Sequence, residues 1–288
     1  MKLKEKTSLK GSVSTSLRVA VGAVLALGMG TATVKATEPC GDFGECKALI
    51  EINSTDGDIG FHFLMDGDDL NSGGINDPNG AKVFEDRAKG PLHEQKLTET
   101  FAESAEPLCW PDPEADPDEE IVTLEEFLER WAAGTYVFSG MGDGGEKSFG
   151  ETELTHALPA APSNLTFDGS AITWAAGDDL GRCASLAELN DLVAVGVLPV
   201  HPEDVTVAAW EIVLEPDVED GDPTGSLVFN VRVSGDIQTK AVTVPADYLA
   251  SLPADTSVKI EVGAIGVDDN ATFTEVVGFC INEDEGCE

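Results

Sequence analysis

The chain has 288 residues, of which 42% are hydrophobic, and a formal net charge of −37 at pH 7. This length predicts two domains of ordinary size, each with enough apolar residues for a core. So strong a negative charge excludes nucleic acid and anionic membrane surfaces as electrostatic partners, because both repel an acidic protein.

Residues 1–36 have the three parts of a secretory signal peptide. Lysines and Arg18 precede an apolar run over residues 19–29, and the segment ends in the cleavage-like triplet Val34-Lys35-Ala36. The apolar run is shorter than the roughly 20 residues that a membrane-spanning helix needs. We therefore expect cleavage after Ala36 and no membrane insertion of the mature chain. The mature protein would then lie in the periplasm, at the cell surface or in the medium.

All six cysteines follow the expected cleavage site, at positions Cys40, Cys46, Cys109, Cys183, Cys280 and Cys287. An even number of cysteines in an exported chain favours disulfides. Six cysteines allow 15 pairings, and sequence alone does not choose among them. A metal site is the alternative, but the two close pairs have five and six residues between their cysteines and no nearby histidine, which does not fit zinc.

The first half of the mature chain, residues 37–160, predicts a mostly β domain with one helix. Short β runs are expected at residues 47–53, 61–65, 82–85, 135–139 and 151–158. Residues 66–80 and 107–120 are expected to form exposed loops. Residues 94–106 fit either a strand or a short helix. A helix is expected over about 123–133, because Thr123 and Glu126 fit a capping box and four apolar residues follow at helical spacing. We expect its apolar stripe to pack in a core. This half resembles no family that we recognise.

Acidic residues and glycines gather in two segments that flank the expected strand at residues 61–65. The carboxylates are Asp56, Asp58, Asp66, Asp68 and Asp69. Ca²⁺ prefers several such oxygens on a turning backbone. The spacing does not fit an EF-hand, because Leu70 stands where an Asp or Asn is needed. Calcium is therefore the one cofactor that we predict, and solvated polar turns are the simpler alternative.

A proline-containing segment at residues 156–162 marks an expected domain boundary. Seven short β runs follow it, at residues 164–167, 171–175, 207–214, 227–233, 241–244, 258–265 and 273–280. Seven such runs in a segment of this length are typical of a β-sandwich. An insertion at about residues 177–202 separates the second and third runs. It predicts a helix, because Ser185 and Glu188 fit a second capping box.

Several of these runs resemble the fibronectin type III family. Ile172-Thr173-Trp174 resembles the family's second strand, Trp210-Glu211-Ile212-Val213-Leu214 its third strand, and Leu252–Val258 the turn before its sixth strand. The resemblance implies an immunoglobulin-like sandwich over residues 161–288 and a binding or spacer role without a named ligand. The chain departs from the family at Val258, where a tyrosine is expected, and at the insertion. We thus predict an all-β protein of two β domains.

The sequence contains no recognisable catalytic constellation. Its four histidines, His62, His93, His156 and His201, are isolated in sequence, and neither a G-x-S-x-G elbow nor a phosphate-binding loop occurs. Paired carboxylates could hydrolyse glycosides, but in so acidic a chain such pairs are expected by chance. We therefore expect a non-catalytic binding or adhesion protein, with an extracellular polysaccharide or protein as its ligand. The alternative is an extracytoplasmic hydrolase with a fibronectin type III spacer domain.

Overall fold

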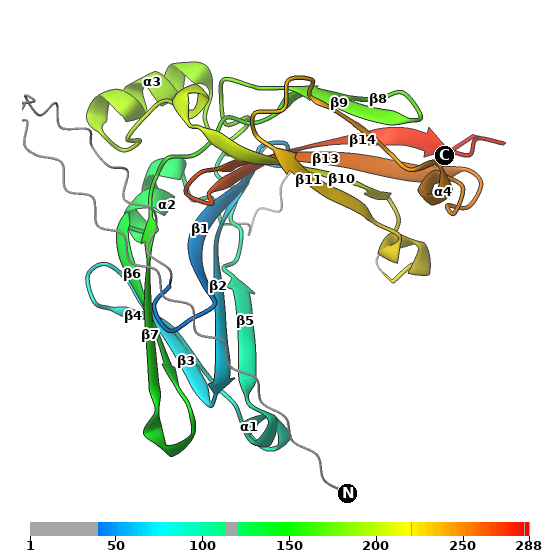
Figure 1. The fold of residues 1–288 in the computed structure, drawn as a ribbon. Coiled ribbons are helices and arrows are strands. Elements are labelled where there is room, and N and C mark those ends of the chain that lie inside the picture. The colour runs from blue at the N-terminus through cyan, green and yellow to red at the C-terminus, as the bar shows by residue number, and fades with distance from the viewer. Residues whose placement is uncertain (1–39, 113–119, 220, 285, 288) are drawn as a thin grey trace, which may run out of the picture. The chain divides into compact units, whose positions relative to one another are not determined.

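The computed structural model describes residues 40–112, 120–219, 221–284, 286 and 287 (Figure 1). The expected signal peptide and residues 113–119 of the acidic segment 107–120 lie outside the described residues. Strands dominate the described chain, and the helices are short, which confirms the all-β prediction. None of the helices in the described part has the length and apolarity needed to cross a membrane.

The strands run through both halves of the chain. They are β1 (Glu45–Asn53), β2 (Asp58–Leu70), β3 (Ser72–Asn76), β4 (Lys82–Arg87), β5 (Leu97–Glu103), β6 (Gly134–Met141), β7 (Lys147–Leu154), β8 (Ser163–Phe167), β9 (Ala171–Ala175), β10 (Val207–Pro216), β11 (Phe229–Ser234), β12 (Ala241–Thr243), β13 (Thr256–Gly266) and β14 (Ala271–Ile281). The α-helices are α1 (Pro91–Gln95), α2 (Leu124–Arg130), α3 (Leu186–Val195) and α4 (Ala246–Leu249).

Both predicted helices form with the caps that the sequence indicates. At α2, the backbone N–H of Glu126 donates to the Thr123 side chain, and the Glu126 carboxylate accepts the Thr123 backbone N–H. At α3, the Glu188 carboxylate accepts hydrogen bonds from both the backbone N–H and the hydroxyl of Ser185. The ambiguous segment 94–106 contains both the end of α1 and all of β5.

One loop prediction is wrong. Residues 66–80 were expected to form a long acidic loop, yet β2 continues to Leu70 and β3 begins at Ser72. Backbone pairing accounts for the difference, because Asp66 pairs with β1 on one side and with β5 on the other. Edge-to-edge hydrogen bonds thus impose a strand on a segment with little apolar patterning.

The strands form three sheets. A seven-stranded sheet has the order β11-β10-β13-β14-β1-β2-β5, a four-stranded sheet the order β4-β3-β6-β7, and a three-stranded sheet the order β12-β9-β8. The seven runs expected in the second half are all strands, β8 to β14. They form a sandwich, in which the three-stranded sheet packs on β10 and β13 and the Trp174 and Trp210 rings lie 6.0 Å apart between centroids.

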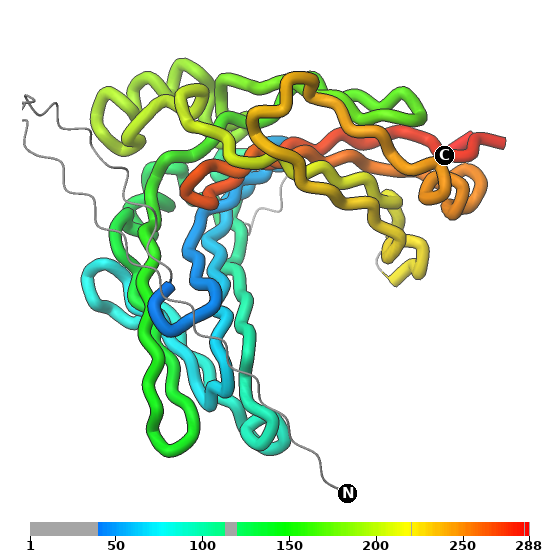
Figure 2. The backbone as a smooth tube through the Cα atoms, viewed as in Figure 1, coloured from blue at the N-terminus to red at the C-terminus, as the bar shows by residue number. Residues whose placement is uncertain are grey.

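The two halves of the chain meet in the seven-stranded sheet, where β1 pairs with β14 in parallel. The pairing covers three residues of each strand, from Glu51 opposite Ala271 to Asn53 opposite Phe273. In Figure 2 the blue tube of β1 lies beside the red tube of β14. The seven-stranded sheet therefore contains two groups of strands that share one short parallel ladder.

A buried asparagine completes this joint. Asn270, immediately before β14, has no solvent exposure. Its side-chain oxygen accepts the backbone N–H of Ile50 in β1 at 2.8 Å, and its amide nitrogen donates to the carbonyls of Thr155 and Ala157 at 2.9 and 3.2 Å. One side chain, immediately before β14, thus binds both β1 and the segment between the two halves.

Two groups of buried residues form the hydrophobic interior. The first core lies between β1, β2, β3, β6, β7 and α2, and α3 adds Leu189 to it. The second core fills the sandwich, and its fully buried members lie between Leu165 and Ile281. The insertion at 177–202 therefore packs on the first core, although it belongs to the second half in sequence.

Disulfides join all six cysteines, as the sequence predicts. The pairs are Cys40 with Cys46, Cys109 with Cys183, and Cys280 with Cys287. The first and third close short loops, whereas the second spans 74 residues and links the two halves. The domain boundary near residue 160 is thus crossed by a β ladder, a disulfide and a helix. Independent folding of the two halves stays a prediction.

We expect a fragment of residues 161–288 carrying Cys183→Ser to fold as a sandwich, because the buried residues of the second core all come from this segment. Its far-UV circular dichroism should be β-type, and it should unfold cooperatively. Residues 177–202 should exchange amide hydrogens rapidly in the fragment, since their partners in the first core are missing. A fragment without cooperative unfolding would mean that both halves depend on one shared interior.

We expect Asn270→Ala to lower the free energy of unfolding by about 3 kcal/mol, because it leaves buried backbone groups of Ile50 and Thr155 without partners. Asn190→Ala on the exposed face of α3 is the matched control and should change stability by less than about 0.5 kcal/mol. Denaturant titration of both variants measures the difference. Equal effects would show that the joint contributes little to stability.

Candidate functional site

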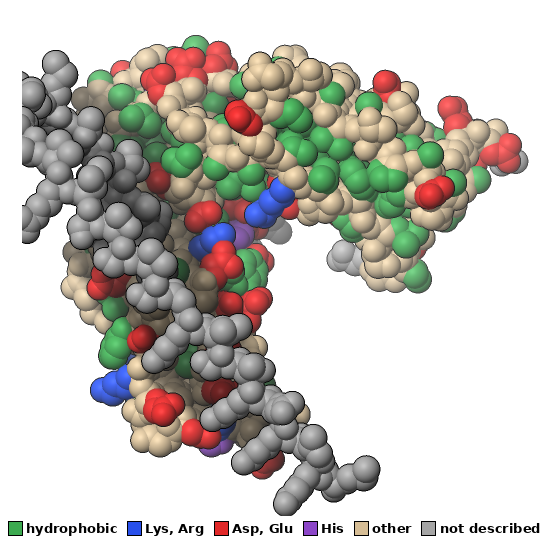
Figure 3. Space-filling model, viewed as in Figure 1, with side chains coloured by type: hydrophobic (Ala, Val, Ile, Leu, Met, Phe, Trp, Pro, Cys, Tyr) green, Lys and Arg blue, Asp and Glu red, His purple; other side chains and the backbone are tan. Residues whose placement is uncertain are grey.

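A groove of about 690 Å³ lies on the face of the seven-stranded sheet that turns away from the two cores. It crosses the β1–β14 joint, and strands of both groups line it. Its acidic lining residues are Glu45, Glu51, Glu103, Glu211, Glu215, Glu261 and Asp269. Figure 3 shows red, blue and purple side chains gathered in the hollow of the visible face.

Strand alternation explains how charged residues come to line the groove. Along β1 the odd-numbered residues, such as Glu51, face the groove, while even-numbered ones such as Ile50 are buried in the first core. The same period of two puts His62 on the groove side of β2 and Phe63 on the core side. Leu49, His62 and Glu103 lie in one cross-strand row over β1, β2 and β5.

The basic side chains on this face are already paired with acids. The nitrogen–oxygen distances are 2.7 to 3.5 Å, and the pairs are Lys47 with Glu45 and Asp269, Arg232 with Glu211, and Lys259 with Glu215 and Glu275. Among the described residues, no lysine or arginine pairs in this way with Glu51, Glu106 or Glu261. In one part of the groove, lysine and arginine side chains therefore neutralise the carboxylates. In the other part, carboxylates lie near one another without a lysine or arginine partner.

The uncompensated part centres on His62. This side chain is 8% exposed, and its Nε2 lies 3.3 Å from Oε1 of Glu106, which follows β5. One oxygen of Glu51, one of Glu106 and a ring nitrogen of His62 all lie within 4.8 Å of one another. Gly60 leaves the space for them, because a Cβ there would lie 2.8 Å from both the Glu106 carboxylate and the His62 ring.

Burial and mutual repulsion shift the pKa values of these groups. Burial raises the pKa of Glu51, and the charge of Glu106 raises it further against the opposing effect of His62. Burial raises the pKa of Glu261 to about 7, and the charge of Glu51 adds to it. Burial alone lowers the pKa of His62, but its hydrogen bond with Glu106 and the charge of Glu51 outweigh this effect, so the pKa is raised. Burial and then Glu106 raise the pKa of Asp58 to about 7.

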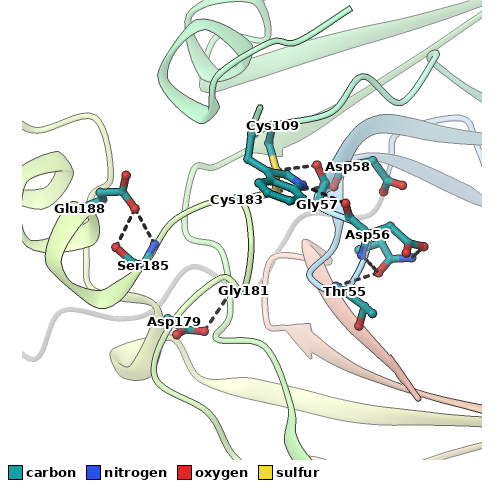
Figure 4. The surroundings of a disulfide bond; sticks show 12 residues. Thr55, Asp56, Gly57, Asp58, Cys109, Asp179, Gly181, Cys183, Ser185 and Glu188 are labelled. Atoms are coloured by element: carbon teal, nitrogen blue, oxygen red, sulfur yellow. Dashed lines mark hydrogen bonds between the residues drawn. A yellow bond between two sulfur atoms is a disulfide. The ribbon is translucent and has the colours of Figure 1, made fainter. Parts of the chain in front are cut away.

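The carboxylates predicted to bind calcium do not come together. Asp56 and Asp58 lie at the turn between β1 and β2, beside the Cys109–Cys183 disulfide (Figure 4), where Asp56 accepts a hydrogen bond from Asn53 at 3.0 Å. Asp66, Asp68 and Asp69 lie near the other end of β2, and the eight residue steps from Asp58 to Asp66 span roughly 26 Å of strand. The five therefore form two separate groups, and calcium binding at either one stays a prediction.

Sequence reasoning treated His62 as isolated and missed its partners. Glu51 and Glu106 are 11 and 44 residues away from it, so no local motif connects the three. The available signal was the β1–β2 hairpin itself. Its register places Glu51 opposite Gly60, one pleat from His62 on the same face.

No family model matches the sequence, and no curated protein matches it. Among solved structures the chain is similar to a tetra-tandem repeat in the extending region of a large adhesion protein, with a TM-score of 0.24 and 12% identity over 82% of this chain and 50% of that one. It is similar to the BSP domain of a biofilm-associated protein, with a TM-score of 0.22 and 10% identity over 85% of this chain and 30% of that one. The chain thus spans half or less of the length of these two structures.

A third similarity is to the fibronectin(III)-like modules of CbhA from Clostridium thermocellum. The TM-score is 0.23 and the identity 9%, over 84% of this chain and 93% of that one.

The raised pKa of Glu261 predicts how the stability of the protein depends on pH. Between the ordinary value of 4.5 and about 7, the folded state holds a proton that the unfolded state has lost. The free energy of unfolding therefore falls as pH rises through this window. Glu261→Gln removes this loss and should raise the free energy of unfolding at pH 8 by at most about 3 kcal/mol relative to the wild type, with little difference at pH 4.5.

Denaturant titrations at both pH values, in buffer with EDTA, measure this difference. Glu219→Gln, an exposed residue outside the groove, is the control for the loss of one negative charge. If the free energy of unfolding at pH 8 rises equally in both variants, the effect reflects the charge of the whole protein and not the burial of Glu261.

Proposed function

We propose that this protein is a secreted or cell-surface binding protein of the adhesion type, whose ligand lies in the groove on the seven-stranded sheet. The observation that supports it is the groove itself. Its volume of about 690 Å³ is within the usual range of ligand sites, and rigid paired strands build its floor. The disulfides support a place outside the cytoplasm, because such bonds persist in oxidising compartments.

The charges of the groove favour a cationic ligand. Seven acidic residues line it against Lys47 and Arg232, and both of these bases are already paired with acids. Apolar side chains lie beside the acids, and one of them, Phe101, is 59% exposed. The long apolar stem of lysine or arginine can pack on such a surface while its charge meets a carboxylate. A basic segment of another protein therefore fits better than an acidic polysaccharide.

The fibronectin type III assignment remains part of this proposal. Seven strands form where the resemblance places them, and they close a sandwich around Trp174 and Trp210. Members of that family commonly serve as binding or spacer modules, which agrees with a non-catalytic role.

A hydrolase is the second candidate, and Glu261 is the observation that favours it. A groove carboxyl with a pKa of about 7 can act as a general acid at neutral pH, and Glu51 is a second carboxylate near it. In this alternative the same groove would hold a substrate and cleave it.

A peptide-binding measurement tests the proposal. We expect a fluorescent basic decapeptide to bind at physiological salt, and a neutral analogue of the same length not to bind. Glu103→Lys, which reverses an exposed charge in the groove, should weaken binding by roughly tenfold, because like charges then face each other. Glu219→Lys makes the same change outside the groove and should leave the affinity nearly unaltered. Fluorescence anisotropy gives both dissociation constants.

Equal weakening by the two variants would mean that the peptide senses only the overall charge, which would refute the groove as the binding site. The same proteins should be incubated with protease, esterase and glycosidase substrates. Turnover that is lost in Glu261→Gln would favour the hydrolase instead.

A further inference from the structure

Three neighbouring side chains suit a metal ion: Glu51 and His62 line the groove, and Glu106 lies beside them. Glu51, His62 and Glu106 each offer one ligand atom, and these atoms lie within 4.8 Å of one another. Two of the three residues lie on strands with a neighbour on both sides, β1 between β14 and β2 and β2 between β1 and β5. Side chains on such strands are held more firmly than side chains on loops, as a metal site requires.

The distances are close to those of a small coordination sphere. The 3.3 Å between Nε2 of His62 and Oε1 of Glu106 is near the tetrahedral ligand–ligand distance of about 3.4 Å that follows from zinc bonds of about 2.0–2.1 Å. The ligand atom of Glu51 lies within 4.8 Å of the other two, so a side-chain movement of at most about 1.4 Å brings it to the same spacing. Solvent from the groove can occupy the remaining position.

The local charge also favours a cation. Elsewhere on this face lysine and arginine neutralise the acids, as described above. In this cluster the described residues provide no such partner for Glu51 or Glu106, and Glu103 adds a further negative charge to the surroundings of both Glu51 and His62. A single imidazole is then the base nearest to these carboxylates, and a divalent ion would supply more positive charge than one protonated His62 can.

We propose that Glu51, His62 and Glu106 bind a divalent transition-metal ion of the zinc type. The buried imidazole decides the class of ion, because imidazole nitrogen suits Zn²⁺, whereas Ca²⁺ and Mg²⁺ prefer oxygen ligands alone. Gly60 belongs to the design of the site, since any side chain at this position would occupy the space between His62 and Glu106. The inference concerns the cluster alone and does not depend on the groove ligand proposed above.

Calorimetric titration of the purified, disulfide-bonded protein with Zn²⁺ tests the site, in buffer with excess Ca²⁺ to saturate general acidic positions. We expect one Zn²⁺ per chain with an affinity that His62→Gln lowers on the order of 100-fold. Glu106→Gln should lower it at least tenfold. Because the Glu106 carboxylate is exposed, Glu106→Gln still tests the site if His62→Gln fails to fold.

Two matched controls separate ligands from residues outside the cluster. His93→Gln removes an exposed histidine on α1, and Glu219→Gln removes an exposed charge outside the groove; each should change the affinity less than about threefold. A ¹⁵N-histidine spectrum should show the ring nitrogens of His62 shifting on addition of Zn²⁺, ahead of those of the other histidines. The site is refuted if wild type, His62→Gln and Glu106→Gln give the same isotherm, or if Zn²⁺ does not bind in the presence of Ca²⁺. Loss of zinc binding with intact peptide binding, or the reverse, distinguishes this inference from the proposed function.

Discussion

The hydrogen bonds of Asn270 hold the two halves of the chain in one sheet. This buried side chain accepts a hydrogen bond from the backbone N–H of Ile50 and donates hydrogen bonds to two carbonyls of the segment between the halves. The parallel ladder beside it is only three residues long, so the joint depends on such side-chain bonds more than a long ladder would. Because the groove crosses this joint, the position of Glu261 relative to Glu51 follows from it.

The groove brings together charges that an extended chain keeps apart. Carboxylates from β1, β10 and β13 share a half-buried surface, and those without a basic partner have raised pKa values. Such an arrangement opposes folding, since each buried charge loses hydration and repels its neighbours. Proteins commonly retain this kind of cost where a ligand or an ion relieves it. The basic segment and the metal ion proposed above are two different ways to relieve it on the same surface, and Glu51 belongs to both sets of carboxylates.

Local patterns were sufficient to predict much of the fold. Alternation identified the seven strands of the second half, and capping residues such as Thr123 and Ser185 identified two helices. The patterns failed at residues 66–70, where pairing with β1 and β5 overrides a polar, glycine-containing sequence. They also failed at the site, because Glu51, His62 and Glu106 meet only through strand register and the path of the chain after β5. Neither is encoded by the spacing of residues within one segment.

The disulfide between Cys109 and Cys183 has a mechanical consequence. When a chain is pulled at its two ends, a fold without cross-links lengthens as its strands are drawn out. The 74 residues spanned by this bond include β6 to β9, and at about 3.4 Å per residue they represent roughly 250 Å of chain that tension cannot extend while the bond is intact. A reducing agent would release that length, so the oxidation state of one bond sets how far the molecule stretches under load.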